Sequence, residues 1–258
     1  MTNAIILSAG QGRRLSPLTD NRPKCLVPIG GRTILEWQLL ALAANGIDDV
    51  TVITGFGAHA VESAIKTMDL PFRAQCLYNP FYSVADNIGS CWEARHLIGE
   101  DSVLMNGDTL FETGVLKRVL AEADAPISIT MDVKEHYDSD DMKVRVDGDR
   151  LTAIGKTLTG RIDGESIGLL RFRDTGGRLF GDTMRAVLDD TGNLKRWYLS
   201  IIDDIAKSGA VGTVRLQGER WCEVDFPTDL PLAEATVGAF NLPVGIATGS
   251  DLRKTGAC

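Results

Sequence analysis

The strongest chemical signal in the sequence is a glycine-rich, basic segment near the amino terminus, residues 7–26, LSAGQGRRLSPLTDNRPKCL. Glycines allow a backbone to approach a phosphate chain closely and to turn its N–H groups toward it. Arg14 and Lys24 add positive charge to the same segment. The pattern predicts a loop that holds the phosphates of a nucleotide. The residues of this segment expected to bind the nucleotide are Leu7, Ala9, Gly10, Gly12 and Arg13.

Two familiar phosphate loops do not fit this segment. A dinucleotide-binding loop continues directly into a helix, and an acidic residue follows its second strand. Here Arg13 leads into a proline-bearing loop, and the second predicted strand ends at Thr54 and Gly55. A Walker A loop needs Lys and then Ser or Thr after its last glycine, but Gly12 is followed by Arg13 and Arg14. The sequence therefore disfavours a dehydrogenase and a Walker A nucleotide site.

The same segment resembles the signature of sugar-1-phosphate-type nucleotidyltransferases, the pyrophosphorylases, which runs G-x-G-small-R-L-x-P-L-T-x-x-x-P-K-x-L. The residues on this pattern, at the right spacing, are Gly10, Gly12, Arg14, Leu15, Pro17, Leu18, Thr19, Pro23, Lys24 and Leu26. Arg13 departs from it, because the family usually has a small residue there. The resemblance extends to about Phe240.

Further motifs resemble both halves of that family's site. Residues 104–108 (LMNGD) resemble the strand that ends in a metal-binding aspartate, Asp108, and residues 221–230 (WCEVDFPTDL) resemble the stretch with the second one, Asp225. The acceptor half is represented by residues 141–144 (DMKV), 154–156 (IGK) and 165–168 (ESIG). This half is more similar to the small cytidylyltransferases acting on phosphocholine, inositol phosphate or aminoalkylphosphonates than to the hexose-1-phosphate enzymes.

The resemblance implies roles for individual side chains. Asp108 and Asp225 would hold Mg²⁺, since the ion prefers hard oxygen ligands. Arg14 and Lys24 would hold the triphosphate and the charge that develops on it. Lys156 would grip the phosphate of the acceptor.

Asn87, Gly89 and Ser90 lie where the family places its base-recognition loop. A pyrimidine edge can be read by backbone groups and an amide side chain. The alternative is that Asn87 only caps a helix that begins at Ile88. Glu223 is two residues before Asp225, so on a strand both carboxylates face one side; a partner of the metal ligands and a solvated sheet edge both fit that pattern.

The acceptor half is rich in aromatic residues, and aromatic faces together with carboxylates bind quaternary ammonium groups. A cationic acceptor would be enclosed by Tyr137, Trp197 or Tyr198, with Glu165 or Asp141 balancing its charge. Trp197 also stands at helical spacing from Ile201, a pattern that fits a core residue somewhat better.

The order of predicted elements indicates an α/β fold. Strand patterns at residues 3–9, 49–54, 72–78 and 102–105 alternate with helical patterns, one of which starts at a capping box formed by Thr33 and Glu36. Such alternation predicts a Rossmann-like three-layer domain with a mostly parallel, mixed central sheet. A hairpin pattern at residues 143–154 predicts a small acceptor subregion. Later segments predicted as strands are residues 166–172 and 211–216, and those predicted as helices are residues 180–188, 197–207 and 228–237.

Length and composition set further limits. The chain has 258 residues, 44% hydrophobic and 24% charged, which is typical of a globular protein. Its net charge of −8 repels nucleic acid and anionic membranes. Five scattered cysteines without a C-x-x-C pair suit a reducing cytoplasm. We expect a cytoplasmic protein, compatible with an oligomer, with a nucleotidyltransferase domain at residues 1–240 and a poorly ordered tail at residues 241–258.

The resemblance implies a Mg²⁺-dependent enzyme that transfers CMP from CTP to a small phosphorylated alcohol or to an aminoalkyl phosphate or phosphonate, releasing pyrophosphate. One alternative is a sugar-1-phosphate uridylyl- or guanylyltransferase. Another is a catalytically silent nucleotide-binding subunit, since folds are reused without chemistry. The presence of Lys24, Asp108 and Asp225 together favours an enzyme over the silent subunit.

Overall fold

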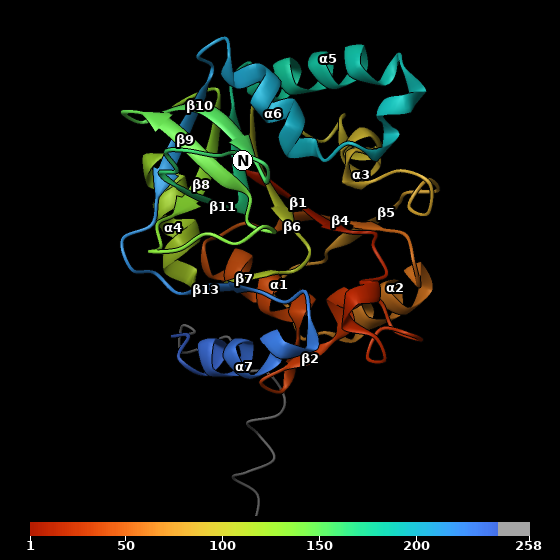
Figure 1. Cartoon of the computed structure of the whole chain (residues 1–258). Helices are drawn as coiled ribbons and strands as arrows, with labels where there is room; N and C mark the ends of the chain where they lie inside the picture. Colours follow the sequence, from red (N-terminus) through yellow and green to blue (C-terminus); the bar gives the residue numbers. More distant parts are fainter. Residues whose placement is uncertain (242–258) are drawn as a thin grey trace, which may run out of the picture.

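A nine-stranded sheet runs through the protein and separates two groups of helices (Figure 1). The structure is a computed structural model, and it describes residues 1–241. The predicted poorly ordered tail therefore lies outside the described residues, apart from Asn241. The α/β class with a mixed central sheet is confirmed.

The first strands of the sheet are parallel. The strand order across the sheet is β5-β4-β1-β6-β11-β8-β12-β10-β9. The parallel set consists of β1 (Asn3–Ser8), β4 (Asp49–Thr54), β5 (Gln75–Tyr78) and β6 (Asp101–Asn106). The strand predicted at residues 72–78 is thus shorter than expected.

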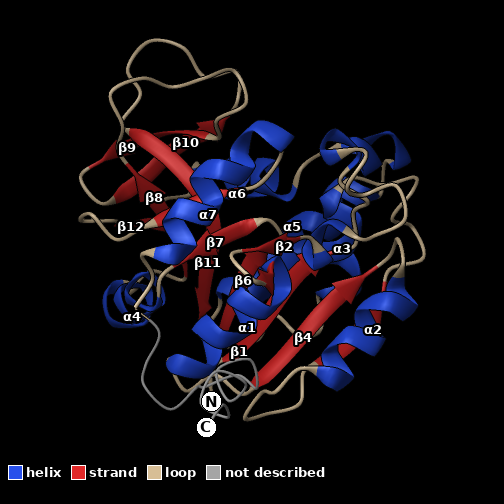
Figure 2. Cartoon of the chain, turned by 90° about the horizontal axis from the view of Figure 1, so that it is seen from below, coloured by secondary structure: helices blue, strands red, loops and turns tan. Residues whose placement is uncertain are grey.

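The second part of the sheet makes it mixed. The long strand β11 (Gly164–Arg173) is antiparallel to both β6 and β8 (Ile127–Asp132). β12 (Val211–Arg215) then pairs in parallel with β8. The predicted hairpin is β9 (Lys143–Asp147) and β10 (Arg150–Gly155), at one end of the sheet (Figure 2).

Alternating residues along a strand enter different cores, because successive side chains of a strand point to opposite faces. On β1, Ile5 packs with helices α3 (Asn87–Ala94), α5 (Gly176–Leu188) and α6 (Tyr198–Ala206). Its neighbours Ala4 and Ile6 pack with α1 (Ile34–Ala44), α2 (Ala58–Thr67) and α4 (Thr113–Glu122) on the other face. One group of helices, the sheet and the other group of helices are therefore the three layers that the sequence predicts.

Two helix starts differ in how well the sequence indicated them. Thr33 caps α1 as expected, since its side chain accepts a hydrogen bond from the backbone N–H of Glu36 at 3.1 Å. α4 was not predicted, and it begins after Glu112 without a side-chain cap, so the usual start signal is missing.

Smaller elements complete the fold around the site. The loop after β1 contains two 3-10 turns, Arg13–Leu15 and Lys24–Leu26. A two-stranded ribbon pairs β7 (Thr109–Phe111) with β13 (Trp221–Glu223), and a second pairs β2 (Pro28–Ile29) with β3 (Arg32–Thr33). Helix α7 (Leu230–Gly238) contacts both ribbons.

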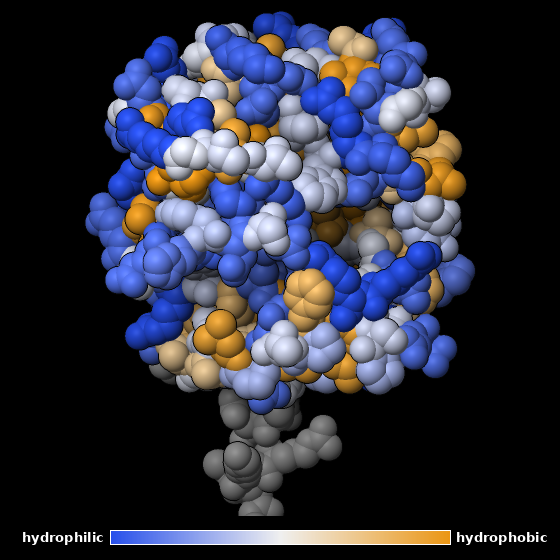
Figure 3. All heavy atoms as spheres, viewed as in Figure 1, coloured by the Kyte–Doolittle hydropathy of each residue, from blue (hydrophilic) through white to orange (hydrophobic). Residues whose placement is uncertain are grey.

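The view in Figure 3 shows a mostly hydrophilic face with scattered hydrophobic residues. Within residues 1–241, no helix is long and apolar enough to cross a membrane.

Candidate active site

Two adjoining cavities lie where the parallel strands β1 and β6 end, which is where ligands bind in open α/β sheets. The first, which we call the charged cavity, has a volume of about 390 Å³. The second, the loop cavity, has a volume of about 290 Å³. Gly10 and Asp108 line both. A larger cavity of about 870 Å³ lies between α3 and α5, and none of the predicted site residues lines it.

The four predicted catalytic residues all line the charged cavity, and Lys24 connects two of them. Its Nζ lies 2.8 Å from Oδ2 of Asp108 and 2.5 Å from Oδ1 of Asp225. Burial of Lys24, whose side chain is 13% exposed, acts to lower its pKa, but the two carboxylates outweigh this effect and raise it. Burial acts to raise the pKa of Asp225, yet Lys24 and Arg14 lower it overall. Both groups are therefore charged at neutral pH.

The backbone of the glycine loop approaches Lys24 closely. Gly12 has a φ of 74°, in the left-handed region that favours glycine. A Cβ atom at Gly12 would lie 2.7 Å from Cβ of Lys24. The loop can therefore pack against the lysine stem only because residue 12 has no side chain.

Arg14 extends the charged network from Asp225 to Asp140. Its guanidinium lies 2.7 Å from Oδ2 of Asp225 and 3.5 Å from Oδ2 of Asp140, and it stacks over the Phe226 ring at 4.9 Å. Lys156 reaches the other carboxylate oxygen of Asp140 at 3.5 Å. Asp140 thus joins the two cations that the sequence assigns to the phosphates.

A second charged group forms the other end of the cavity. Lys134 Nζ lies 2.8 Å from Asp141 and 3.0 Å from Glu165. Burial raises the pKa of Glu165 to about 7, Lys134 opposes this shift, and Asp141 adds to it. Glu223 also lines the cavity, where burial and the carboxylates of Asp108 and Asp225 raise its pKa to about 8.

The donor set near Lys24 suits a divalent cation. Oδ1 of Asp108 is buried and makes no hydrogen bond, although its other oxygen binds Lys24. A buried carboxylate oxygen without a partner is costly unless a cation or donor meets it. Among residues 1–241, no cluster of three or more acidic, histidine or cysteine side chains could hold a metal alone. Any ion held here would therefore take its remaining ligands from water or phosphate oxygens, as Mg²⁺ commonly does.

The predicted nucleotide-binding residues do not all line one cavity, and Gly10 and Asn87 line both the loop cavity and the charged cavity. Those that line the loop cavity are Leu7, Ala9, Gly10, Asn87 and Ser90. Gly12 instead lines the charged cavity, and Arg13 lies on the far side of the loop. Gly89 does not line either cavity: its Cα faces Ala85, and a Cβ atom there would lie 2.7 Å from the alanine methyl group.

The helix-cap alternative for Asn87 is wrong. The side chain of Asp86 caps α3 by accepting a hydrogen bond from the N–H of Asn87 at 2.7 Å. Oδ1 of Asn87 instead accepts a hydrogen bond from the backbone N–H of Tyr198 at 2.8 Å. Asn87 therefore connects the start of α3 to the start of α6.

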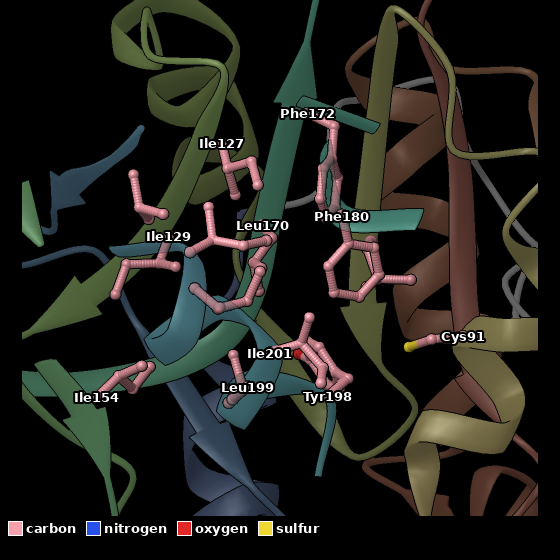
Figure 4. Packing of buried hydrophobic residues seen from close by; sticks show 14 of the residues in the cluster. Cys91, Ile127, Ile129, Ile154, Leu170, Phe172, Phe180, Tyr198, Leu199 and Ile201 are labelled. Carbon is pink, nitrogen blue, oxygen red and sulfur yellow. The ribbon is translucent and has the colours of Figure 1, made fainter. Parts of the chain in front are cut away.

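The three aromatic residues predicted to enclose a cationic acceptor lie in different places. Tyr198 is fully buried beside Ile201 in the core (Figure 4), and its hydroxyl donates to Oδ1 of Asn106 at 3.0 Å. Tyr137 lies outside the charged cavity, and its hydroxyl accepts from the N–H of Lys134 at 3.3 Å. Trp197 does line the cavity, but the ammonium group of Lys156 lies 4.2 Å from its ring centroid. The assignment of Tyr198 to the acceptor wall is therefore wrong, because core packing buries it. The assignments of Trp197 and Tyr137 stay predictions.

Several lining residues were missed. Asn106 and Gly107 lie inside the LMNGD motif, and Asp140 directly precedes DMKV, so these motifs could have indicated them. Asn79 and Tyr82 come from the irregular segment before α3, which has no local signal for a site.

The sequence profile described as nucleotidyl transferase matches residues 3–141, more than half of the chain. The chain belongs to this family. The nucleotidyltransferase is 34% identical over 122 residues to CMP-5'-(3-aminopropyl)phosphonate synthase from Streptomyces rubellomurinus, a match that covers 47% of this chain but only 19% of that protein. It is 24% identical over 254 residues to CTP:phosphoglutamine cytidylyltransferase from Campylobacter jejuni, covering 88% of this chain and 97% of the other.

The nucleotidyltransferase also shares its fold with solved structures. CTP:phosphocholine cytidylyltransferase from Streptococcus pneumoniae superposes with a TM-score of 0.76 at 20% identity, over 92% of this chain and 99% of that one. The inositol-1-phosphate CTP transferase from T. maritima gives 0.79 at 20% identity, over 95% and 97% of the two chains. At this identity, the likeness establishes the fold.

Proposed function

We propose that the protein transfers CMP from CTP to a small phosphorylated alcohol or to an aminoalkyl phosphate or phosphonate, and releases pyrophosphate. The observation that carries this proposal is the convergence of Arg14, Lys24, Asp108 and Asp225 on one cavity beside the glycine loop. The choice of CTP rests on the relatives: two are cytidylyltransferases by name, and a third is named as the synthase of a CMP-linked aminopropylphosphonate.

The reaction requires little covalent help from the protein. An oxygen of the acceptor phosphate attacks the α-phosphorus of CTP, a new P–O bond forms, and the bond to the oxygen of the departing pyrophosphate breaks. Catalysis then consists of aligning two anions and neutralising their crowded charge. Arg14 and Lys24 supply that charge, and their aspartate partners hold both side chains at the charged cavity.

Asp108 and Asp225 are the proposed ligands of Mg²⁺, and the unpartnered Oδ1 of Asp108 supports this assignment. When bound, the ion would neutralise phosphate charge and orient the triphosphate. In the structure Lys24 occupies the position between the two carboxylates. Arrival of a metal and a triphosphate would therefore require the ammonium group to exchange its carboxylate partners for phosphate oxygens.

The acceptor is proposed to lie between Lys156 and Glu165, at the other end of the charged cavity. Lys156 and Arg14 would hold its phosphate, and both already point toward Asp140. The carboxylates of Glu165 and Asp141 are available for hydroxyl or ammonium groups of a compact head group. A cavity of about 390 Å³ suits a ligand of this size.

A sugar-1-phosphate nucleotidyltransferase is the runner-up. Its support is the resemblance of residues 7–26 to the signature of the sugar-1-phosphate-type enzymes. A silent subunit is disfavoured, because all of the proposed catalytic side chains are present and arranged together.

The test is pyrophosphate release by the full chain in Mg²⁺ with CTP, UTP, GTP or ATP. Each triphosphate is combined with phosphocholine, phosphoethanolamine, 2-aminoethylphosphonate, inositol phosphate or glucose-1-phosphate. We expect turnover with CTP and one of the compact acceptors. Preference for glucose-1-phosphate with UTP or GTP would support the runner-up, and no turnover with any pair would support the silent subunit.

A further inference from the structure

A further cavity borders the glycine loop. Its volume is about 280 Å³, and Arg13 and Lys195 line it together with Gly12, Tyr82 and Ala85. We call it the Arg13 cavity. Gly12 also lines the charged cavity, whereas Tyr82 and Ala85 also line the loop cavity. The same short loop therefore borders all three spaces.

The Arg13 cavity has positive charge and no carboxylate in its lining. Arg13 Nε reaches only the amide oxygen of Gln11, at 3.3 Å, and neither Arg13 nor Lys195 forms an ion pair within residues 1–241. The cations of the charged cavity differ, because Arg14, Lys24 and Lys156 each contact an aspartate. Two unpaired cations beside a phosphate loop, in a chain with a net charge of −8, indicate an anionic ligand.

Hydrogen bonds to the start of α3 position the backbone on both sides of Lys195. The backbone N–H of Asp86 donates to the carbonyl of Leu194 at 2.8 Å, and Oδ1 of Asn87 accepts from the N–H of Tyr198. These two hydrogen bonds hold residues 194–198 against the first turn of α3. Lys195 consequently lines the Arg13 cavity, while Trp197 of the same segment lines the charged cavity.

We infer that Arg13 and Lys195 form a subsite for the terminal phosphates of the triphosphate, and so for the pyrophosphate that leaves. The inference rests on the proposed function, which requires the α-phosphate to face Lys24 and the acceptor. The triphosphate chain must then continue along the glycine loop, and Gly12 is the residue at which the charged cavity meets the Arg13 cavity. Arg13 also replaces the small residue of the signature, so this chain adds a charge at that position.

Arginine and lysine would contribute differently to the subsite. A guanidinium can donate two parallel hydrogen bonds to phosphate oxygens, whereas an ammonium acts as a point charge. Arg13 is therefore expected to be more sensitive to a conservative change than Lys195. Both act on the terminal phosphates and not on the base, so their removal should leave CMP binding unchanged.

The experiment is calorimetric titration of the full chain with inorganic pyrophosphate, tripolyphosphate and CMP. The variants are Arg13→Ala, Lys195→Ala, Arg13→Lys and Lys195→Arg. Lys117→Ala is the matched control, since Lys117 is exposed on α4 and lines none of the three cavities. We expect each alanine variant to bind pyrophosphate and tripolyphosphate about tenfold more weakly, the usual effect of losing a hydrogen bond to a charged group. Lys195→Arg should restore most of the affinity.

The proposal is overturned if the wild-type chain does not bind pyrophosphate, or if both alanine variants bind it within twofold of wild type. It is also overturned if CMP affinity falls as much as pyrophosphate affinity, since that pattern would indicate a damaged loop. The probes contain neither acceptor nor, for the inorganic anions, a base. The subsite can therefore fail while CTP turnover is normal, and it can hold when the preferred triphosphate is not CTP.

Discussion

Lys24 is the side chain on which the proposed chemistry depends most directly, because it contacts both aspartates and lies beside the glycine loop. The negative charge on the phosphoryl oxygens grows as pyrophosphate leaves, so we expect the lysine to act mainly in the transition state. Lys24→Ala should lower kcat by about 100- to 1,000-fold, the usual cost of losing one electrostatic stabiliser. Steady-state kinetics would show this, and a change in KM alone would instead identify a ground-state binding residue.

Asp108 and Asp225 are both expected to be necessary for turnover. Asp108→Asn or Asp225→Asn should abolish Mg²⁺-dependent turnover, since an amide is a weaker ligand than a carboxylate, while circular dichroism should show an unchanged fold. Asp124→Asn, at an exposed position outside both cavities, is the control. Near-normal activity of either active-site variant in Mg²⁺ would disprove the assignment of metal ligands.

Glu165 should make the stability of the protein depend on pH. Burial raises its pKa from 4.5 to about 7, so between these values the native state binds more protons than the unfolded chain. The free energy of unfolding must then fall as pH rises through this window, by at most about 3 kcal/mol. Glu165→Gln removes this titratable carboxyl group and its contribution to the pH dependence of stability.

Thermal unfolding of wild type and Glu165→Gln from pH 5 to pH 8 tests this dependence. We expect the variant to gain stability relative to wild type as pH rises. Glu135→Gln, at an exposed position, should show no such trend. Parallel curves for Glu165→Gln and wild type would mean that Glu165 is ionised throughout the range.

At the scale of elements, the cap of α1 can be separated from the chemistry. The Thr33 hydroxyl accepts a hydrogen bond from the N–H of Glu36, and Thr33 lines neither the charged cavity nor the loop cavity. Thr33→Ala should lower the free energy of unfolding by about 1 kcal/mol, or the melting temperature by about 2–4 °C for a chain of this size. Thr33→Ser should keep the cap, and kcat should not change in either variant. Loss of activity in Thr33→Ala at low temperature would show that α1 positions the site.

At the scale of the whole molecule, the sheet connects the amino-terminal parallel strands to the later strands that were proposed to hold the acceptor. β11 pairs with β6 of the first half and with β8 and β9 of the second, so neither half can keep its core without the other. We expect one cooperative unfolding transition, as for a single domain. Far-ultraviolet circular dichroism and tryptophan fluorescence should give the same midpoint. An earlier transition in one signal would indicate two domains.

The sequence by itself determined the parts of this protein that depend on neighbours along the chain. The glycine loop, the strand ending near Asp108, the Thr33 cap and the β9–β10 hairpin each follow from a local pattern of glycines, apolar alternation or capping residues. Motif spacing also brought together Arg14, Lys24, Asp108 and Asp225 as candidates, and the structure places all four on one cavity.

The tertiary structure alone decided which of these groups touch. Nothing near Tyr198 in the sequence distinguishes a binding-site aromatic from a core residue, and packing between α6 and the sheet buried it. Lys24 pairs with Asp108, which is 84 positions away in the sequence, and with Asp225, which is 201 positions away. Lys195 lines the same cavity as Gly12 and Arg13, and a hydrogen bond from Asp86 to the carbonyl of Leu194 holds its segment against the start of α3. Such contacts depend on how helices and strands pack, which local periodicity does not encode.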